Sequence, residues 1–320
     1  GRARAEALAY AMTAELRGAR DELASTLNAI PDLLMEIGPD GRIVYCRSGH
    51  LAPLAEPARH FVGMQLEDIV QPDAAAGCRA AIQAATATGY SAGHQFRLDL
   101  QGQPYWFELS IARKPGGGPG EPPCFIALSR DITERKNAEA RSHQLAYFDA
   151  LTQLPNRRHF NEVLLREWER SSRTRKPLAL LFLDVDYFKR YNDHYGHQQG
   201  DRCLQAVAGA LEEAVNRPYD LLARYGGEEF ACVLPNTLLE DAALVAERMR
   251  ANVQLLQLEH LNSDVGQSVT VSLGVAAMTA NHATAPQTLI EEADRRLYQA
   301  KQAGRARVCF DNLAASLPSE

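Results

Sequence analysis

Residues 178–186 read LALLFLDVD, a continuous apolar run that ends in two aspartates. An unbroken apolar run of this length is typical of a strand that is covered on both faces. Along the chain it is followed by two helical patterns, a hairpin, a helix and a strand, and then by one more helix and a short strand. We therefore expect a mixed α+β domain with residues 178–186 at the centre of its sheet.

The order of these elements contains a strand–helix–strand–strand–helix–strand arrangement, which is the plan of ferredoxin-like (palm) folds. In that plan the first strand lies beside the hairpin that the second and third strands form. The hairpin of this chain is centred on RYGGEEF, residues 224–230. Gly226 and Gly227 suit a two-residue loop, because glycine accepts the positive φ that such loops require.

Two carboxylates, Glu228 and Glu229, follow the glycines. If the first strand lies beside the hairpin, Asp184 at its end approaches both glutamates. Three neighbouring carboxylates repel one another and raise one another's pKa, unless a cation lies between them. Oxygen-only ligation favours Mg²⁺, so the pattern predicts a magnesium site. The alternative is a solvated hairpin tip, where glutamate is common.

Three charged residues on the predicted helices have structural as well as functional explanations. Asp201 begins a predicted helix, where a carboxylate is a common N-cap, and Gly196 is expected to end the helix before it. Lys301 and Arg305 lie four residues apart near the end of the last predicted helix, which places both on one face. Two cations at that position also complement the helix C-terminus.

The first half of the chain has a different pattern. Residues 3–29 place apolar residues at roughly helical spacing and predict a long amphipathic helix, a candidate for dimerisation. LLMEIGPDGRIVYC, residues 33–46, predicts a hairpin around a Pro-Asp-Gly turn. Short helical pieces are expected at about residues 51–87. Three further strand candidates follow, HQFRLDL, YWFELSIAR and CFIALSRDIT, and a Gly/Pro-rich loop joins the last two.

This order of two strands, short helices and three strands resembles a PAS domain, whose sheet is antiparallel. DITERK, residues 131–136, is similar to the exit by which PAS domains continue into an output helix. The predicted organisation is an N-terminal helix (1–29), a PAS sensor domain (30–133), a connecting helix (134–148), the second domain (149–312) and a tail (313–320).

The second domain resembles a GGDEF domain, the diguanylate cyclase fold, over nearly its whole length. The resemblance rests on DALTQLPNRR, LFLDVDYFKRYNDHYGHQQGD, RYGGEEF, VSLGVA and ADRRLYQAKQAGRARV, which occur in the family's order. The signature reads Gly-Gly-Glu-Glu-Phe, an accepted active form of the motif that names the family. Gln153 and Ala306 replace residues that are common in the family, and neither position carries the chemistry.

The resemblance implies that two GTP molecules condense to cyclic di-GMP and two pyrophosphates. Each domain of a homodimer holds one GTP, and the 3′-hydroxyl of one attacks the α-phosphorus of the other. Mg²⁺ or Mn²⁺ would neutralise the phosphates and polarise phosphorus. Positioning and charge stabilisation carry most of such phosphoryl chemistry.

The resemblance also assigns residues. Asp184, the carbonyl of Val185 and Glu228 would hold the metal ion. Glu229 would be a second metal contact or assist deprotonation, and the backbone of residues 186–189 would bind phosphate at a helix start. The implied GTP-binding residues are Phe188 and Lys189 in this phosphate loop, Asn192 and Asp201 at the guanine edge, Gly226 and Gly227 at the turn, and Lys301 and Arg305 at the β- and γ-phosphates.

RPYD, residues 217–220, lies just ahead of the signature and fits the family's RxxD product-inhibition site. Arg217 would contact a phosphate and a guanine of cyclic di-GMP, and Asp220 would accept hydrogen bonds from guanine. Arg248, on the helix after the hairpin, would complete the site. From spacing alone, the usual explanation is a surface ion pair at a helix end.

The composition of the whole chain is that of a folded protein. It has 320 residues, 46% hydrophobic residues and a net charge of -6, which argues against binding to a nucleic-acid polymer. The six cysteines are scattered without metal-ligand spacing, so we interpret them as core residues in a reducing bacterial cytoplasm. No apolar run approaches the ~20 residues of a membrane helix. The chain begins with Gly1, which leaves an anchor in a longer parent protein open.

The sequence leaves the PAS ligand unknown. No flavin-type cysteine motif is present, and His50, His60 and His94 are possible haem ligands, although such histidines are more often surface or hydrogen-bonded residues. Two other interpretations of the chain belong to different classes, a catalytically silent receptor for cyclic di-GMP or GTP and a structural dimerisation protein. The complete set of charged site residues favours catalysis.

Overall fold

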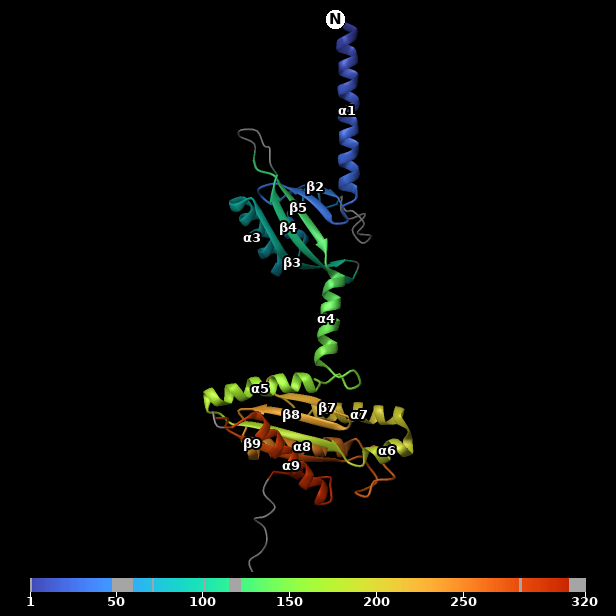
Figure 1. Ribbon diagram of the computed structural model, residues 1–320, viewed down its shortest axis with the longest axis vertical. Helices are drawn as coiled ribbons and strands as arrows, with labels where there is room; N and C mark the ends of the chain where they lie inside the picture. Colours follow the sequence, from blue (N-terminus) through green and yellow to red (C-terminus); the bar gives the residue numbers. More distant parts are fainter. Residues whose placement is uncertain are drawn as a thin grey trace, which may run out of the picture. The chain divides into compact units, whose positions relative to one another are not determined.

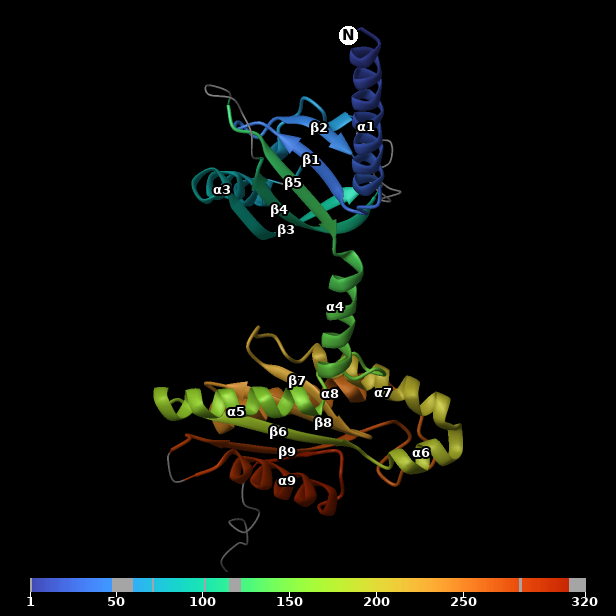
Figure 2. The same ribbon diagram turned by 45° about the horizontal axis from the view of Figure 1, so that its top comes forward.

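The computed structural model describes residues 2–47, 60–70, 72–100, 102–114, 122–281 and 284–310. The chain forms two compact units, residues 1–140 and 141–320 (Figure 1 and Figure 2). Within the described ranges, no helix is long and apolar enough to cross a membrane. All six cysteines are free thiols, so no disulfide stabilises either unit. The tail predicted at 313–320 and His50 lie outside the described residues.

The first unit is built on one antiparallel sheet with the order β2-β1-β5-β4-β3. Its strands alternate: Leu33, Met35 and Ile37 are buried, and the residues between them are half-buried, as expected for a sheet with one covered face. The antiparallel PAS-type sheet is therefore confirmed. The strands are β1 (Leu33–Ile37), β2 (Ile43–Arg47), β3 (Tyr90–Leu100), β4 (Gln103–Arg113) and β5 (Phe125–Asp131).

The helices of the first unit differ from the expected short pieces. After the one-turn helix α2 (Leu66–Ile69), α3 (Pro72–Thr88) runs for 17 residues. Its buried residues are small, namely Ala75, Cys78, Ala81 and Ala85. Their helical spacing lets α3 pack closely on the sheet, but an alanine stripe gives a weak hydrophobic signal in the sequence.

Helix α1 (Arg2–Asn28) exposes its large apolar side chains. Met12 is 56% exposed, Leu16 is 69% exposed and Leu23 is 60% exposed, and spacings of four and seven residues place them on one face. Figure 1 shows the helix extending away from the sheet of its own unit. Helices of this kind gain most of their stability from packing an apolar stripe, and within the described residues this stripe has no such cover.

The second unit has a five-stranded sheet with the order β10-β9-β6-β8-β7. All eight residues of β6 (Leu178–Val185) are buried, and β6 lies between β8 and β9. The strands other than β10 have the ferredoxin-like order, so the predicted α+β class is confirmed. The other strands are β7 (Leu221–Gly226), β8 (Glu229–Pro235), β9 (Val271–Met278) and β10 (Val308–Cys309), which pairs in parallel with β9.

Helices cover both faces of this sheet (Figure 2). Side chains of β6 alternate between two cores: Leu181 and Leu183 join one, and Leu180 and Phe182 join the other. The first core contains α6 (Phe188–Tyr195), α7 (His197–Glu212) and α8 (Leu239–Leu255); the second contains α5 (Arg157–Thr174) and α9 (Pro286–Gln302). Helix α4 (Thr133–Tyr147) contains the boundary between the two units, at residues 140 and 141.

A candidate active site at the end of strand β6

Strand pairing brings the end of β6 to the signature hairpin. Asp184 on β6 is the register partner of Glu229 on β8. The Val185 amide donates a hydrogen bond to the carbonyl of Glu228 at 3.2 Å. The strand register therefore brings Asp184 and Val185 beside the hairpin turn in which Glu228 lies.

Asp184 has an unusual electrostatic environment. Its carboxylate is largely buried and forms an ion pair with the Lys301 ammonium at 2.8 Å. Burial raises the pKa of Asp184 to about 6 against the lowering effect of Lys301, and the nearby carboxylates of Glu228 and Asp186 raise it further. A buried acid held beside another carboxylate gains from a second cation.

The three carboxylates do not converge as the sequence predicts. Glu229 is exposed and Glu228 is half-buried. Across the described ranges, no three His, Cys, Asp or Glu side chains are grouped so that they could hold a metal ion. The expectation of a three-carboxylate cluster was therefore wrong. Two carboxylates, Asp184 and Glu228, remain beside the backbone of Val185. This oxygen donor set fits Mg²⁺, which typically binds one or two carboxylates together with substrate phosphates.

The second aspartate of LALLFLDVD has a structural role. Asp186 is 1% exposed, and its carboxylate accepts hydrogen bonds from Thr270 Oγ1 at 2.8 Å and Ser272 Oγ at 2.7 Å. It also accepts the backbone amide of Ala306 at 3.1 Å. Asp186 thus ties the end of β6 to β9 and to the segment after α9, both of which border the site.

The predicted phosphate loop follows directly. Tyr187 adopts a left-handed conformation with φ 56° and precedes the first turn of α6. Phe188 is buried and stacks on Tyr191 with ring centroids 6.2 Å apart, whereas Lys189 is exposed. Because the first amides of a helix have no intrahelical acceptor, the start of α6 offers donors to an anion. The Asp186 amide, which was expected to join them, already donates to a backbone carbonyl at 2.9 Å.

Asn192 and Asp201 lie on consecutive helices. Gly196 is the last cap of α6 and the first cap of α7, so α7 begins four residues earlier than expected. Asp201 is inside α7, and its interpretation as an N-cap was wrong. Oδ1 of Asn192 is buried without a hydrogen-bond partner among the described residues.

Sequence reasoning missed Gly200, which makes room for Asn192. A Cβ atom at Gly200 would lie 1.8 Å from Oδ1 of Asn192 and 3.3 Å from Cζ of Phe188. Only glycine therefore allows the Asn192 amide its position. No local signal marked this role, because Gly200 lies just before the helix start that was predicted at Asp201, where glycine is common.

The expected geometry of Lys301 and Arg305 was wrong. Helix α9 ends at Gln302, so Arg305 does not continue the face that carries Lys301. Arg305 has a φ of 60°, and its guanidinium donates to the Tyr187 hydroxyl at 3.0 Å. The Lys301 ammonium forms an ion pair with Asp184, so its role is not limited to complementing the negative end of the helix dipole. Arg305 therefore reaches the phosphate loop through the turn after α9, and not through its spacing from Lys301 on the helix.

The hairpin uses its glycines in different ways. Gly226 is the last residue of β7, and only Gly227 has a positive φ, at +55°; the expectation that both need one was wrong. A Cβ atom at either position would meet nothing within 4 Å, so the turn is open on one side. The sequence did not reveal the support of the turn by Arg224, which donates to the Gly227 carbonyl at 2.9 Å and pairs with Asp149 at 2.9 Å.

The residues of the predicted inhibitory site are gathered outside this centre. Asp220 is partly buried and its Oδ1 has no hydrogen-bond partner among the described residues. Burial raises the pKa of Asp220, and the charges of Arg217 and Arg248 oppose that rise. Within the described ranges no ion pair joins Arg217 to Asp220; Arg217 is instead 3.4 Å from Thr237 Oγ1, so the surface ion pair expected from spacing is not formed.

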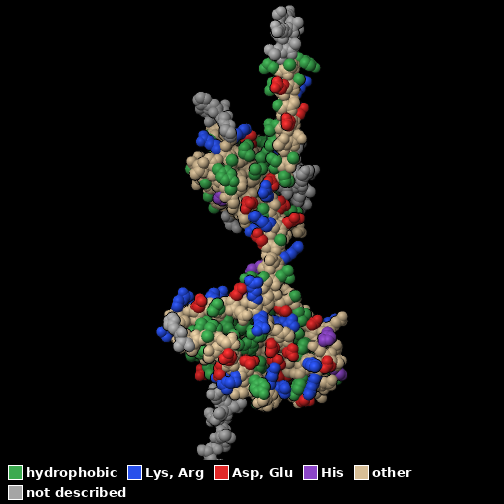
Figure 3. Space-filling view, in the orientation of Figure 1, with side chains coloured by type: hydrophobic (Ala, Val, Ile, Leu, Met, Phe, Trp, Pro, Cys, Tyr) green, Lys and Arg blue, Asp and Glu red, His purple; other side chains and the backbone are tan. Residues whose placement is uncertain are grey.

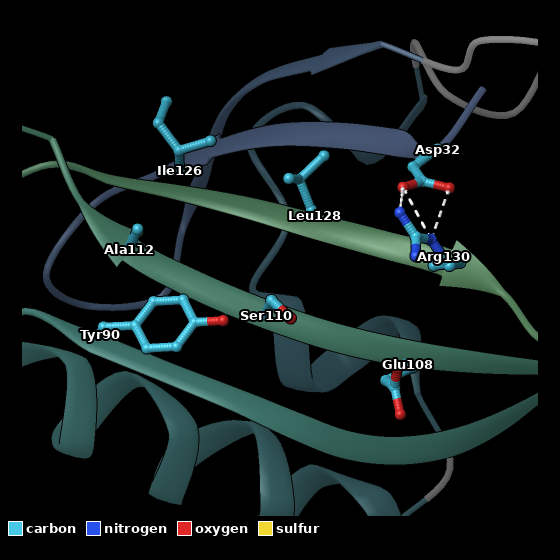
Figure 4. A pocket seen from close by; sticks show the side chains of 8 residues that line it. All are labelled: Asp32, Tyr90, Glu108, Ser110, Ala112, Ile126, Leu128 and Arg130. Atoms are coloured by element: carbon cyan, nitrogen blue, oxygen red, sulfur yellow. Dashed lines mark hydrogen bonds and ion pairs between the residues drawn. The ribbon is translucent and has the colours of Figure 1, made fainter. Parts of the chain in front are cut away.

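The first unit has an open groove of about 240 Å³ on the face of its sheet that the buried core does not use. Figure 4 shows its apolar floor, with Ile126 and Leu128, and the ion pair of Asp32 with Arg130 at one end. The two described candidate haem ligands do not line it. His60 is exposed, and His94 is 2.8 Å from Ser91 Oγ.

Two family profiles match the chain. The profile described as "Diguanylate cyclase, GGDEF domain" matches residues 146–307, half of the chain. The profile described as "PAS fold" matches residues 27–137. The order of a PAS domain followed by a GGDEF domain is therefore confirmed.

Two curated relatives match about half of this chain. Diguanylate cyclase DgcP of Pseudomonas aeruginosa is 41% identical over 165 residues, which are 52% of this chain and 24% of the relative. Response regulator PleD of Caulobacter vibrioides is 39% identical over 173 residues, 54% of this chain and 38% of the relative. The chain thus spans less than half the length of these relatives.

A solved structure shows the same fold. The crystal structure of the coiled coil and GGDEF domain of DgcB from Caulobacter crescentus, in complex with c-di-GMP, aligns with a TM-score of 0.50 and 31% identity. The alignment covers 56% of this chain and 92% of that one.

Proposed function

Because the chain belongs to the diguanylate cyclase GGDEF family, we propose that it condenses two molecules of GTP to cyclic di-GMP and two pyrophosphates. One observation carries the proposal: the buried carboxylate of Asp184, paired with Lys301 at 2.8 Å, lies beside the Glu228 segment of the hairpin. Such a mixture of acid and base at the start of a helix suits a nucleotide triphosphate and its cation.

Each residue then has a defined task. The first amides of α6 and the Arg305 guanidinium bind phosphate oxygens, and Lys301 leaves Asp184 to join them. Asp201 accepts from N1 and N2 of guanine, two donors that adenine lacks, and Asn192 contacts the same base edge. The open side of the turn at Gly226 and Gly227 admits the nucleotide.

The chemistry joins two such sites. Two bonds form between a 3′-oxygen and an α-phosphorus, two α–β phosphoanhydride bonds break, and two hydroxyl protons leave. Mg²⁺ or Mn²⁺, held by Asp184, Glu228 and the Val185 carbonyl, supplies charge neutralisation and a lower hydroxyl pKa when it is bound. Glu229 is exposed at the mouth of the turn, where it takes part in metal contact or in proton removal.

Regulation completes the proposal. A single site holds one GTP, so catalysis requires a homodimer, and the PAS unit with α1 and α4 sets how two cyclase units meet. Cyclic di-GMP binds at Arg217, Asp220 and Arg248 and inhibits. The unpartnered Oδ1 of Asp220 supports this role, since a buried acceptor without a donor favours a ligand that brings one. We place the reaction in the bacterial cytoplasm.

The test is turnover of GTP with Mg²⁺ by the full chain, after bound nucleotide has been removed, with cyclic di-GMP as the measured product. We expect turnover, and we expect Glu228→Gln to lower it by more than about 100-fold, because the loss of one charged contact to the transition state has that order. Glu247→Gln, a surface glutamate on α8, is the matched control and should be as active as the parent chain.

A silent receptor is the competing function. It predicts no turnover in the parent chain together with tight binding of cyclic di-GMP that Arg217→Ala abolishes. Turnover that Glu228→Gln leaves unchanged would contradict the proposed metal site.

A further inference from the structure

Tyr187 lies between two arginines. The guanidinium of Arg305 is 4.3 Å from the centre of the Tyr187 ring, and that of Arg190 is 4.5 Å from it. Arg305 also donates to the Tyr187 hydroxyl at 3.0 Å. Stacking over a ring and a hydrogen bond to its hydroxyl fix both the plane and the direction of the Arg305 guanidinium.

Asp264 interacts with both arginines and with Tyr187. Arg190 donates to the carboxylate of Asp264 at 2.8 Å, and this contact lowers the pKa of Asp264, as do a hydrogen bond with Tyr187 and the charge of Arg305. The negative charge of Asp264 offsets the repulsion between two cations on one ring. Arg190 therefore bonds directly to this carboxylate. Arg305 belongs to the segment after α9, which Asp186 holds by accepting the Ala306 amide.

The backbone of Tyr187 is held as firmly as its ring. Its left-handed conformation is costly for a residue other than glycine. Its carbonyl accepts the Tyr191 amide at 3.1 Å, and the ring nitrogen Nε2 of His260 lies 3.3 Å from the same oxygen. His260 is 1% exposed, so Nε2 donates to this carbonyl from a fixed position.

Arg305 has little support of its own. It lies beyond the end of α9, and its amide closes the helix by donating to the Ala300 carbonyl at 3.0 Å. The side chain is long and would otherwise sample many rotamers, which costs free energy when a ligand orders it.

We propose that Tyr187 is a positioning residue for GTP binding, which holds Arg305 ready for the β- and γ-phosphates by stacking and by its hydroxyl. This inference rests on the proposed function, because it assigns Arg305 to those phosphates. In this proposal the Tyr187 side chain contacts no phosphate. Its contribution is the order that it gives to Arg305 before the ligand arrives.

The experiment is a double-mutant cycle on the full chain. Calorimetry with Mg²⁺ measures binding of 3′-deoxy-GTP, which lacks the attacking hydroxyl and cannot react, and of GMP, which lacks the β- and γ-phosphates. The variants are Tyr187→Ala, Tyr187→Phe, Arg305→Ala and the double variant Tyr187→Ala/Arg305→Ala. Tyr195→Phe is the control, because it removes a hydroxyl from the same helix that bonds to Glu259 and the Leu261 amide, away from Arg305.

We expect Tyr187→Ala to weaken 3′-deoxy-GTP binding by about tenfold and GMP binding by less than about twofold, since a cation–ring contact with one hydrogen bond has this order. Tyr187→Phe should lie between Tyr187→Ala and the parent chain, which protects the result if the alanine variant folds poorly. The double variant should bind no more weakly than Arg305→Ala alone, because the effect of Tyr187 acts through Arg305.

Two outcomes overturn the inference. If the losses multiply in the double variant, or if GMP binding falls as much as 3′-deoxy-GTP binding, Tyr187 does not act through Arg305. If the parent chain binds neither nucleotide, the proposed function fails as well, and this outcome differs from the first because no variant is needed to see it.

Discussion

At the scale of single residues, neighbouring atoms and hydrogen bonds fix the positions of several side chains at the site. Asn192 occupies the space that a Cβ atom at Gly200 would need. The Asp186 carboxylate accepts hydrogen bonds from three donors. The Asp184 carboxylate pairs with Lys301 and faces the proposed ligand site. Two aspartates two residues apart, one near the end of β6 and one just after it, therefore have different roles, and the partners of each carboxylate decide its role.

Gly200→Ala should separate stability from binding. Alanine inside α7 favours the helix by about 0.5–1 kcal/mol, but the new methyl group would displace Asn192. We expect GTP affinity to fall by about tenfold, the value of one lost hydrogen bond. The measurement is calorimetric binding of 3′-deoxy-GTP. Gly209→Ala, in the same helix with open space around its Cβ, should raise the melting temperature and leave affinity unchanged; equal effects of both substitutions would refute the packing argument.

His260 should make the second unit sensitive to acid. Burial lowers the pKa of His260, the nearby charges of Arg190 and His194 lower it further, and the bond to the Tyr187 carbonyl opposes them. At a pH between the lowered pKa of folded His260 and its ordinary pKa, the unfolded chain is protonated at His260 and the folded chain is not. Stability should fall as the pH drops below about 6.5, the ordinary histidine pKa.

The check is calorimetric melting of the parent chain and His260→Gln between pH 7.5 and pH 5.5. Glutamine still donates to the Tyr187 carbonyl but does not titrate, so the variant should lose less stability over this range. His159, whose pKa burial also lowers, is present in both proteins and cancels. Parallel pH profiles would show that His260 is not responsible.

At the scale of elements, the features that local sequence patterns determine could be predicted, and those that depend on contacts between distant residues could not. The strand at 178–186 and the hairpin at Gly226–Gly227 were predicted to within one residue, because apolar runs and glycine turns are local signals. In the structure the strand ends at Val185 and the turn lies at residues 227 and 228. The pairing of Asp184 with Glu229 followed from strand order. The position of Arg305 was missed although Gly304, which directly follows the C-cap of α9 and has a φ of +104°, is the usual signal for a helix end. The direction in which the chain turns after that glycine depends on tertiary contacts, which have no local signal in the sequence.

Element boundaries also depend on single caps, and Asn156 is the clearest case. Its Oδ1 accepts the His159 amide at 3.1 Å as the N-cap of α5, and its Nδ2 donates to the Ala146 carbonyl at 3.0 Å. Asn156→Ala should destabilise the second unit by about 2 kcal/mol through the lost cap and the second bond. Asn156→Asp, which keeps only the acceptor, should cost less.

Calorimetry of the full chain measures this prediction, because the transition that 3′-deoxy-GTP shifts to higher temperature belongs to the second unit. If the two substitutions lower that transition equally, the cap contributes nothing and the argument fails.

At the scale of the whole molecule, the two units have separate cores. The second unit contains the complete candidate site, so nucleotide binding should not need the first. The exposed apolar stripe of α1 belongs to the first unit, where it suits association with a second copy. The sequence indicated this division from the change in pattern near residue 134, although it left the PAS ligand unknown because no cofactor motif is present.

A chain without residues 1–133 should bind 3′-deoxy-GTP with the affinity of the full chain but dimerise more weakly. Its specific activity should therefore be lower at low protein concentration and rise more steeply with concentration. Sedimentation and product formation over a dilution series measure both effects. The same dimer affinity and specific activity as the full chain would sink the proposed role of the first unit.

The three hydrogen bonds of Asp186 have a consequence for genetics. Thr270, Ser272 and the Ala306 amide converge on one buried carboxylate, yet none of these groups is assigned a contact with the nucleotide. A screen for loss of signalling would therefore recover substitutions at Ser272 beside those at Glu228. Signalling at several temperatures would distinguish the two classes. Ser272 alleles should be temperature-sensitive, whereas Glu228 alleles should be null at every temperature.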